Sequence, residues 1–337
     1  MKIGIVTFYN HSNYGAVLQA YALQNKIEDF NHECYHIDFN DLIEKKEINS
    51  NTSPILKLLY SNTEKREKNF EDFRKKYINI IDFKDIKKLD RVIVGSDQVW
   101  NPSVTNLDSR YFLDFVSEDK RYSYAASFGS KIDDKYKEIF KENLQKFNKI
   151  SVRENCAKEE LNDLIGQNVD VVIDPVFLLP KERWELLIKD IPSIDDKYIL
   201  LIMVQNDINL YKKWQEKAKE EGLLLKVITA SYFPVIGFKS WSEISVLEWL
   251  RLIYDADLVV TSSFHGFAFS IIFNKKYKVE LLTGKLENRN IRLLEFANKV
   301  DIDLEGEYKE STKLNDYISQ SLVFLEDILG ENNDRCK

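Results

Sequence analysis

The feature that most constrains the fold is a repeated alternation of short apolar runs with segments of helical periodicity. Most of these runs are almost continuously hydrophobic, which is typical of parallel strands covered by helices on both faces. Between the first two runs, the segment 14–30 carries an apolar stripe suited to a helix. The strands predicted for the first half of the chain are 2–8, 34–38, 91–95, 121–127, 149–152 and 169–173.

The same alternation restarts in the second half, beyond a connection that contains Pro180 and Pro192. Two consecutive β/α halves indicate an α/β protein with two Rossmann-like, doubly wound domains that face a cleft, followed by a C-terminal helix. We place the first domain at residues 1–178, with a helical insertion at about 40–80, and the second at 179–330. The strands predicted for the second half are 198–204, 223–229, 258–261 and 276–282, and its helices are 209–221, 246–254, 265–273, 290–299 and 314–329.

Charge and cysteine content disfavour several classes of protein. The 55 acidic and 48 basic side chains give a net charge of −7, whereas binding a phosphate backbone usually requires a basic face, so no nucleic-acid partner is expected. The three cysteines lie far apart, without a C-x-x-C pair or the spacing of a zinc site, which indicates a reducing compartment. No apolar run is long enough for a transmembrane segment. We expect a cytoplasmic protein, free or at the inner face of the membrane.

Polar groups follow two of the first-domain strands, where ligands of α/β sheets usually bind. Asn13 and Gly15 stand at the start of the first helix, and Asp97, Gln98 and Trp100 follow the strand 91–95. These groups suit a sugar ligand. The amides and the carboxylate can hydrogen-bond to its hydroxyls, and the indole can stack on its ring. The alternative is structural: Asn13 caps the helix, Asp97 belongs to a turn and Trp100 is buried.

Cationic and hydroxyl groups follow other strands. Arg153 emerges where the strand 149–152 ends, placed to bind a carboxylate or phosphate or, alternatively, to pair with a nearby acid. The strand 258–261 leads through Ser263 and His265 to Gly266, which opens a helix whose free N–H groups favour an anion. The alternative is that Ser263 is a cap, with His265 packed against aromatic rings. Arg289 and Arg292 lie three residues apart at another helix start, as further anion ligands or as a solvated turn.

Taken in order, these segments resemble the polysaccharide pyruvyl transferase family. Each motif alone is weak, but the ordered set covers the chain from Met1 to about Leu294. The most specific segment is 95–102, which reads Gly-Ser-Asp-Gln-Val-Trp-Asn-Pro. The other matching segments are Asn13-Tyr14-Gly15-Ala16 with Gln19, Tyr124-Ala125-Ala126-Ser127-Phe128-Gly129, Ser151-Val152-Arg153-Glu154, Asp174-Pro175 and Ser263-Phe264-His265-Gly266.

The resemblance implies a GT-B-like fold and an enzyme that moves the pyruvate unit of phosphoenolpyruvate onto a sugar as a cyclic ketal. In this chemistry His265 is the general acid, Asp97 the base, and Arg153 with Arg292 hold the carboxylate and phosphate. Ser263, Gly266 and Arg289 complete the donor site in the second domain, and Asn13, Gly15, Gln98 and Trp100 bind the acceptor in the first. Many members carry an arginine ahead of this histidine, whereas this chain has Phe264, and the role of that arginine passes to Arg289 or Arg292.

The acceptor is expected to be a sugar of a cell-surface polysaccharide or its precursor, in free, lipid-linked or nucleotide-linked form. No metal and no other cofactor is expected. Two alternatives stay open at this point. One is a nucleotide-sugar-dependent glycosyltransferase of the same fold, which would need a base pocket and a pyrophosphate cradle in the second domain. The other is a sugar-recognition protein whose catalytic site has decayed.

Overall fold

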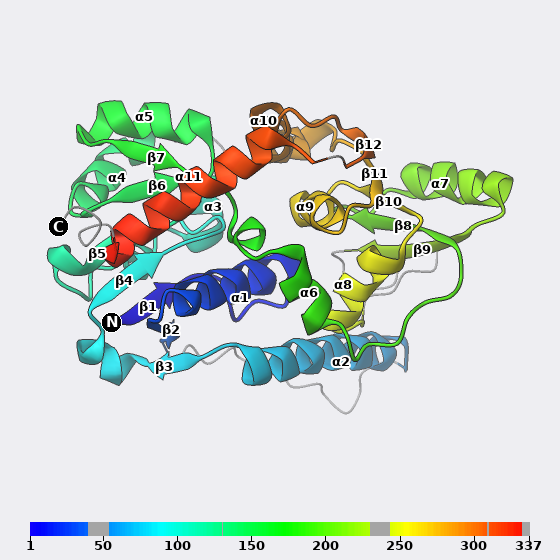
Figure 1. Cartoon of the computed structure of the whole chain (residues 1–337), viewed down its shortest axis with the longest axis horizontal. Coiled ribbons are helices and arrows are strands. Elements are labelled where there is room, and N and C mark those ends of the chain that lie inside the picture. Colours follow the sequence, from blue (N-terminus) through cyan, green and yellow to red (C-terminus); the bar gives the residue numbers. More distant parts are fainter. Residues whose placement is uncertain (40–53, 130, 230–242, 309, 332–337) are drawn as a thin grey trace.

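The first domain is built on a parallel sheet in the order β3-β2-β1-β4-β5 (Figure 1). The computed structural model describes residues 1–39, 54–129, 131–229, 243–308 and 310–331, without the side chains of 54–62, Lys285 and Arg289. The central strand β1 pairs in parallel with β2, with Ile3 opposite Cys34, and with β4 on its other side. Single parallel bridges join the pair β6-β7 to the β5 edge. The strands are β1 (Lys2–Val6), β2 (Glu33–Asp38), β3 (Ile80–Asp82), β4 (Arg91–Val94), β5 (Arg121–Ser123), β6 (Ile150–Val152) and β7 (Val169–Val171).

Helix α1 (Tyr14–Asp29) connects β1 to β2 and is buried over most of its length, because it lies between the first sheet and the second domain. The long helix α2 (Pro54–Tyr77) leads to β3. Along the lower edge of Figure 1 it passes beneath α1 and reaches α8 of the second domain. The other helices of the first domain are α3 (Pro102–Thr105), α4 (Lys137–Leu144) and α5 (Asn155–Ile165).

The second domain has its own five-stranded sheet, in the order β12-β11-β10-β8-β9. All its pairs are parallel except the edge pair β11-β12, which is antiparallel. The strands are β8 (Tyr198–Met203), β9 (Leu224–Thr229), β10 (Leu258–Thr261), β11 (Lys276–Val279) and β12 (Glu305–Glu307). The helices are α6 (Lys181–Leu187), α7 (Ile208–Glu221), α8 (Val246–Asp255), α9 (Phe264–Ile272), α10 (Ile291–Val300) and α11 (Thr312–Leu329).

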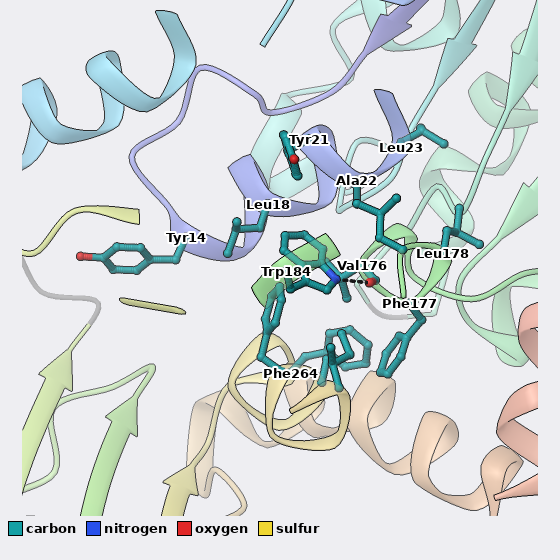
Figure 2. Packing of buried hydrophobic residues seen from close by; sticks show 14 of the residues in the cluster. Tyr14, Leu18, Tyr21, Ala22, Leu23, Val176, Phe177, Leu178, Trp184 and Phe264 are labelled. Carbon is teal, nitrogen blue, oxygen red and sulfur yellow. Dashed lines mark hydrogen bonds between the residues drawn. The ribbon is translucent and has the colours of Figure 1, made fainter. Parts of the chain in front are cut away.

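One continuous hydrophobic core joins the two domains. Trp184 of α6 is fully buried, with its ring centroid 5.7 Å from that of Tyr21 in α1 and 4.8 Å from that of Phe269 in α9. Figure 2 shows this packing and the hydrogen bond that the Trp184 indole N–H donates to the Val176 carbonyl, at 3.3 Å. Aromatic side chains of this size contribute most of the apolar area buried at such a junction, so they hold the domains in a defined relative position.

The C-terminal helix α11 ties the second domain back to the first, across which it runs in Figure 1. The Ser321 hydroxyl accepts a hydrogen bond from the Ile173 N–H at 2.9 Å. The Arg91 guanidinium donates to the Ile328 carbonyl. Within the described part of the chain, no helix combines the length and the hydrophobicity needed to cross a membrane.

The expected α/β architecture with two Rossmann-like domains is confirmed. Every predicted strand is present, β10 with the predicted bounds and the others with shifted or shortened ends. Two edge strands were not predicted. β3 is only three residues long, and β12 reads Glu-Gly-Glu, so neither carries an apolar run. The connection between the sheets, residues 172–197, contains the boundary placed at 178. Of the predicted helical insertion, α2 lies within the described residues and 40–53 lie outside them.

Candidate active site

A cavity of about 250 Å³ lies between the domains, lined by segments that follow strands of both sheets. Its position agrees with the general rule that ligands of α/β folds bind beyond the carboxyl ends of strands. The polar residues of its wall include Asn13, Asp97 and Gln98 from the first domain and Ser263, His265 and Arg292 from the second. Six of the residues predicted to form the site therefore meet around one cavity.

His265 lies in the first turn of α9, and its side chain is 11% exposed. Ser263 is the N-cap of this helix, with its hydroxyl accepting a hydrogen bond from the Gly266 N–H at 3.4 Å. The imidazole Nε2 lies 3.5 Å from the Asp174 carboxylate, beyond normal hydrogen-bond distance. A carboxylate at this position orients the ring. Asp174 is therefore a positioning residue for His265.

Asp174 is itself held by Arg153. The Arg153 Nη2 lies 2.9 Å from Asp174 Oδ2 and also donates to the Ser96 hydroxyl. Both side chains are almost completely buried. Burial alone would raise the pKa of Asp174, but the charge of Arg153 and the neighbouring His265 lower it to about 2. The carboxylate is thus ionised at neutral pH, and the chain of contacts runs from Arg153 through Asp174 to His265.

Arg153 does not line the large cavity. It lines a small neighbouring cavity of about 10 Å³, room for one water molecule, and Arg292 lines both cavities. Arg153 Nε and Nη1 and Arg292 Nε have no hydrogen-bond partner among the described residues. Burial, followed by the charge of Arg153, lowers the pKa of Arg292. Among the arginines whose side chains the structure describes, Arg292 is the one that lines the large cavity, and its Nη1 lies 3.8 Å from Asp97 Oδ1.

The first-domain wall combines structural and ligand-facing roles. Asn13 caps α1, where its side chain accepts from the Ala16 N–H at 3.2 Å, and it also lines the cavity. Asp97 has a left-handed φ of 75°, and its Oδ1 accepts from the Gln98 N–H at 2.8 Å. A non-glycine residue in this conformation is uncommon and is often found at functional sites.

Besides Arg153, three further predicted site residues do not line the large cavity. Trp100 is 0% exposed, and its indole N–H donates to the Tyr111 carbonyl at 3.0 Å, so the prediction that it stacks on a sugar is wrong. A Cβ on Gly266 would lie 2.4 Å from Thr261 Oγ1, which shows that its open side faces the protein interior instead of a ligand. A Cβ on Gly15 would lie 2.0 Å from His265 Nδ1, so Gly15 makes room for the imidazole and not for the acceptor.

Phe264 occupies the place ahead of the histidine where many relatives carry arginine. The Arg153 guanidinium carbon lies 5.6 Å from the centroid of its ring, at the distance of a cation–π contact. Phe264 therefore packs against Arg153 and supplies no charge of its own. Of the two arginines expected from the sequence to replace that cation, Arg292 lines the large cavity, while the Arg289 side chain lies outside the described residues.

Replacing Gly15 by Ala is expected to lower turnover by roughly 10²-fold, because the new methyl group would displace the His265 ring, and misplacement of a reacting group by about 1 Å has effects of this size. Turnover and thermal unfolding would be measured together. Gly4→Ala is the matched control, since its Cβ would meet Leu89 at 2.6 Å outside the cavity lining. Overpacking should destabilise both variants. Equal turnover in the two would show that the position of the His265 ring does not depend on Gly15.

Sequence reasoning missed two residues as members of the site. Asp174 was quoted only as part of the Asp-Pro motif, although an acid after a predicted strand was a usable signal. His11 lines the cavity beside Asn13 and was not singled out, although it is one of only four histidines and follows the first strand. Among the described residues, no three His, Cys, Asp or Glu side chains form a group that could hold a metal ion.

Two Rossmann-like domains with a polar cavity between them form an architecture that is common among group-transfer enzymes. Within this class, the sequence matches the polysaccharide pyruvyl transferase family over residues 13–276. The match covers most of the chain, so this protein belongs to that family and is a transferase. A search of curated proteins finds no match.

Solved structures are similar to this chain at low sequence identity. UDP-N-acetylglucosamine 2-epimerase from Rickettsia bellii is 14% identical, with a TM-score of 0.50 and coverage of 98% of this chain and 96% of that chain. The UDP-GlcNAc 2-epimerase from Methanocaldococcus jannaschii is 14% identical, with a TM-score of 0.48 and coverage of 96% and 92%. An E. coli heptosyltransferase with ADP is 10% identical, with a TM-score of 0.39 and coverage of 86% and 89%. The GT-B-like arrangement expected from the sequence is confirmed.

Proposed function

We propose that this enzyme transfers the pyruvate unit of phosphoenolpyruvate onto two hydroxyls of one sugar, forming a cyclic ketal and releasing phosphate. The observation that carries the proposal is the position of His265 in the interdomain cavity, 3.5 Å from Asp174, in a cavity that Arg292 also lines. A proton donor beside an anion-binding group is what an enol phosphate with a carboxylate requires.

The reaction needs protons in defined places. His265 protonates the methylene carbon of phosphoenolpyruvate, and a sugar hydroxyl attacks the oxocarbenium-like carbon that results. Loss of phosphate and attack by a second hydroxyl close the ketal. Two hydroxyl protons leave the sugar, of which one replaces the proton taken up by the methyl carbon and the other leaves with phosphate. The hydroxyl that attacks first needs a base to accept its proton, and Asp97 on the cavity wall is the candidate for that base.

The two substrates are assigned to opposite walls of the cavity. Ser263 and Arg292 belong to the second-domain wall and form the donor side with His265. Asn13 and Gln98 belong to the first-domain wall and form the acceptor side. Gln98 Oε1 accepts a hydrogen bond from the Asn101 side-chain amide at 2.7 Å, which turns the Gln98 amide N–H groups toward other partners. A sugar with adjacent hydroxyls suits these amide groups and the Asp97 carboxylate.

The test is phosphate release from phosphoenolpyruvate in the presence of a panel of sugars in free, lipid-linked and nucleotide-linked forms. We expect release that depends on one class of acceptor, and a product whose mass increases by one pyruvate less one water. In a second experiment, calorimetry measures the binding of phosphoenolpyruvate and of UDP-sugars to the enzyme. Binding and turnover of a UDP-sugar, without phosphoenolpyruvate turnover, would assign the chain to the glycosyltransferase alternative instead.

A further inference from the structure

His11 presents an imidazole to the same cavity from the first domain. It follows β1, and it lines the cavity together with Asn13 and Asp97. The ring packs on Phe8, with centroids 4.9 Å apart, and Phe8 in turn contacts Tyr111 edge-on at 5.5 Å. Within the described part of the chain its side chain makes no hydrogen bond that would occupy the ring nitrogens. His11 is thus an exposed residue that rests on Phe8 and keeps its proton-accepting atom available to the cavity.

The surroundings of His11 favour the neutral ring. Burial lowers its pKa below the ordinary value, and Asp97 opposes that shift. At pH 7 the imidazole is therefore mostly uncharged and able to accept a proton. The charged groups around the ring are Asp97 after β4, Glu67 and Arg74 of α2, and His265 and Arg292 on the opposite wall.

Ketal formation deprotonates two hydroxyls in succession, and the wall facing the donor carries two groups able to serve them. The Asp97 carboxylate has one oxygen bound to the Gln98 N–H and facing Arg292, the cation assigned to the donor. Because Asp97 faces the donor side, it is the base assigned to the hydroxyl that attacks the donor carbon first. The second hydroxyl belongs to a neighbouring carbon of the same sugar ring, so it needs an acceptor displaced from Asp97 along the same wall. His11 meets this requirement.

We propose that His11 is the second base of the reaction and accepts the proton of the hydroxyl that closes the ketal; this inference rests on the proposed function. In this step the carbon–oxygen bond to phosphate breaks, with its electron pair leaving on phosphate. The hydroxyl oxygen forms its bond to the same carbon, and its proton passes to the His11 ring and then to the released phosphate. No atom changes oxidation state, and no further reactant is needed.

The experiment compares His11→Asn with the wild-type enzyme, using phosphoenolpyruvate and the acceptor identified by phosphate release. We expect kcat to fall by roughly 10²–10³-fold with an unchanged KM for phosphoenolpyruvate. In the wild-type enzyme kcat/KM should fall at acidic pH, where the His11 ring becomes protonated. This fall should be lost in His11→Asn. Mass spectrometry of the acceptor should show a singly linked adduct that still carries phosphate. Imidazole added to His11→Ala should restore part of the turnover, which a purely structural role would not allow.

His32→Asn is the matched control, because His32 lies away from the cavity, where its Nε2 faces Glu331 at 3.0 Å, and it should keep wild-type turnover. Thermal unfolding of each variant reports whether the fold is retained. Wild-type kcat, an unchanged pH profile and no phosphorylated adduct in His11→Asn would overturn the assignment of His11. Failure of the wild-type enzyme itself to turn over phosphoenolpyruvate would instead overturn the proposed function, and this inference with it.

Discussion

Replacing His265 by Gln is expected to lower turnover by roughly 10²–10⁴-fold while changing the affinity for phosphoenolpyruvate little. Glutamine keeps a hydrogen-bonding side chain of similar size, but it has no proton to deliver to the methylene carbon. The fold should be retained, since no large apolar volume is emptied. Asp174→Asn should give a smaller loss of turnover, because the imidazole stays present and loses the charge 3.5 Å from Nε2. The same substitution leaves the buried Arg153 without its anionic partner, so it should also lower stability.

The measurement combines single-turnover kinetics with calorimetry of phosphoenolpyruvate binding. His32→Gln serves as the control, as a histidine substitution outside the cavity. Incorporation of solvent deuterium into the product methyl group gives a direct readout of proton delivery to carbon. A His265→Gln enzyme with normal turnover would leave His265 as a packing residue at the start of α9, and Asp97 would become the next candidate for the acid.

Replacing Arg153 by Met is expected to lower the free energy of unfolding by about 3–5 kcal/mol, the usual cost of breaking a buried ion pair from one side. The substitution leaves Asp174 buried without the cation that lies 2.9 Å away, and it removes the donor to Ser96. The conservative Arg153→Lys keeps the charge and loses the planar fork. We expect this variant to stay folded and to lose less stability than Arg153→Met, because a cation still faces Asp174.

Urea unfolding at several pH values tests the ion pair. Because the native pKa of Asp174 is lowered to about 2, its contribution to stability is fully present above the unfolded value of about 3.9 and is lost as the pH falls toward 2. The difference in free energy of unfolding between wild type and Arg153→Met should therefore be largest near pH 7 and shrink below pH 4. Adding Asp174→Asn to Arg153→Met should recover part of the stability. A pH-independent difference would mean that Arg153 stabilises the fold by packing alone.

The sequence by itself determined the order and type of most elements and the edges at which chemistry could occur. Near-continuous apolar runs are required wherever a strand is covered on both faces, so β1, β8 and β10 were visible without any tertiary information. Residues placed directly after such strands must lie at the carboxyl edge of a sheet. For this reason Asn13, Asp97, Ser263 and His265 were predicted as site residues before their contacts were known, and all four line the cavity.

Only the tertiary structure decided which way each of these residues faces and what it pairs with. Trp100 follows Asp97 by three residues, yet its indole lies in the core, because the turn after β4 directs the two side chains apart. The contact of Gly15 with His265 joins segments 250 positions apart in the sequence, and Asp174 reaches His265 across the domain junction. Such contacts depend on how two separately wound sheets pack against each other. The periodicity within either half contains no information on that packing.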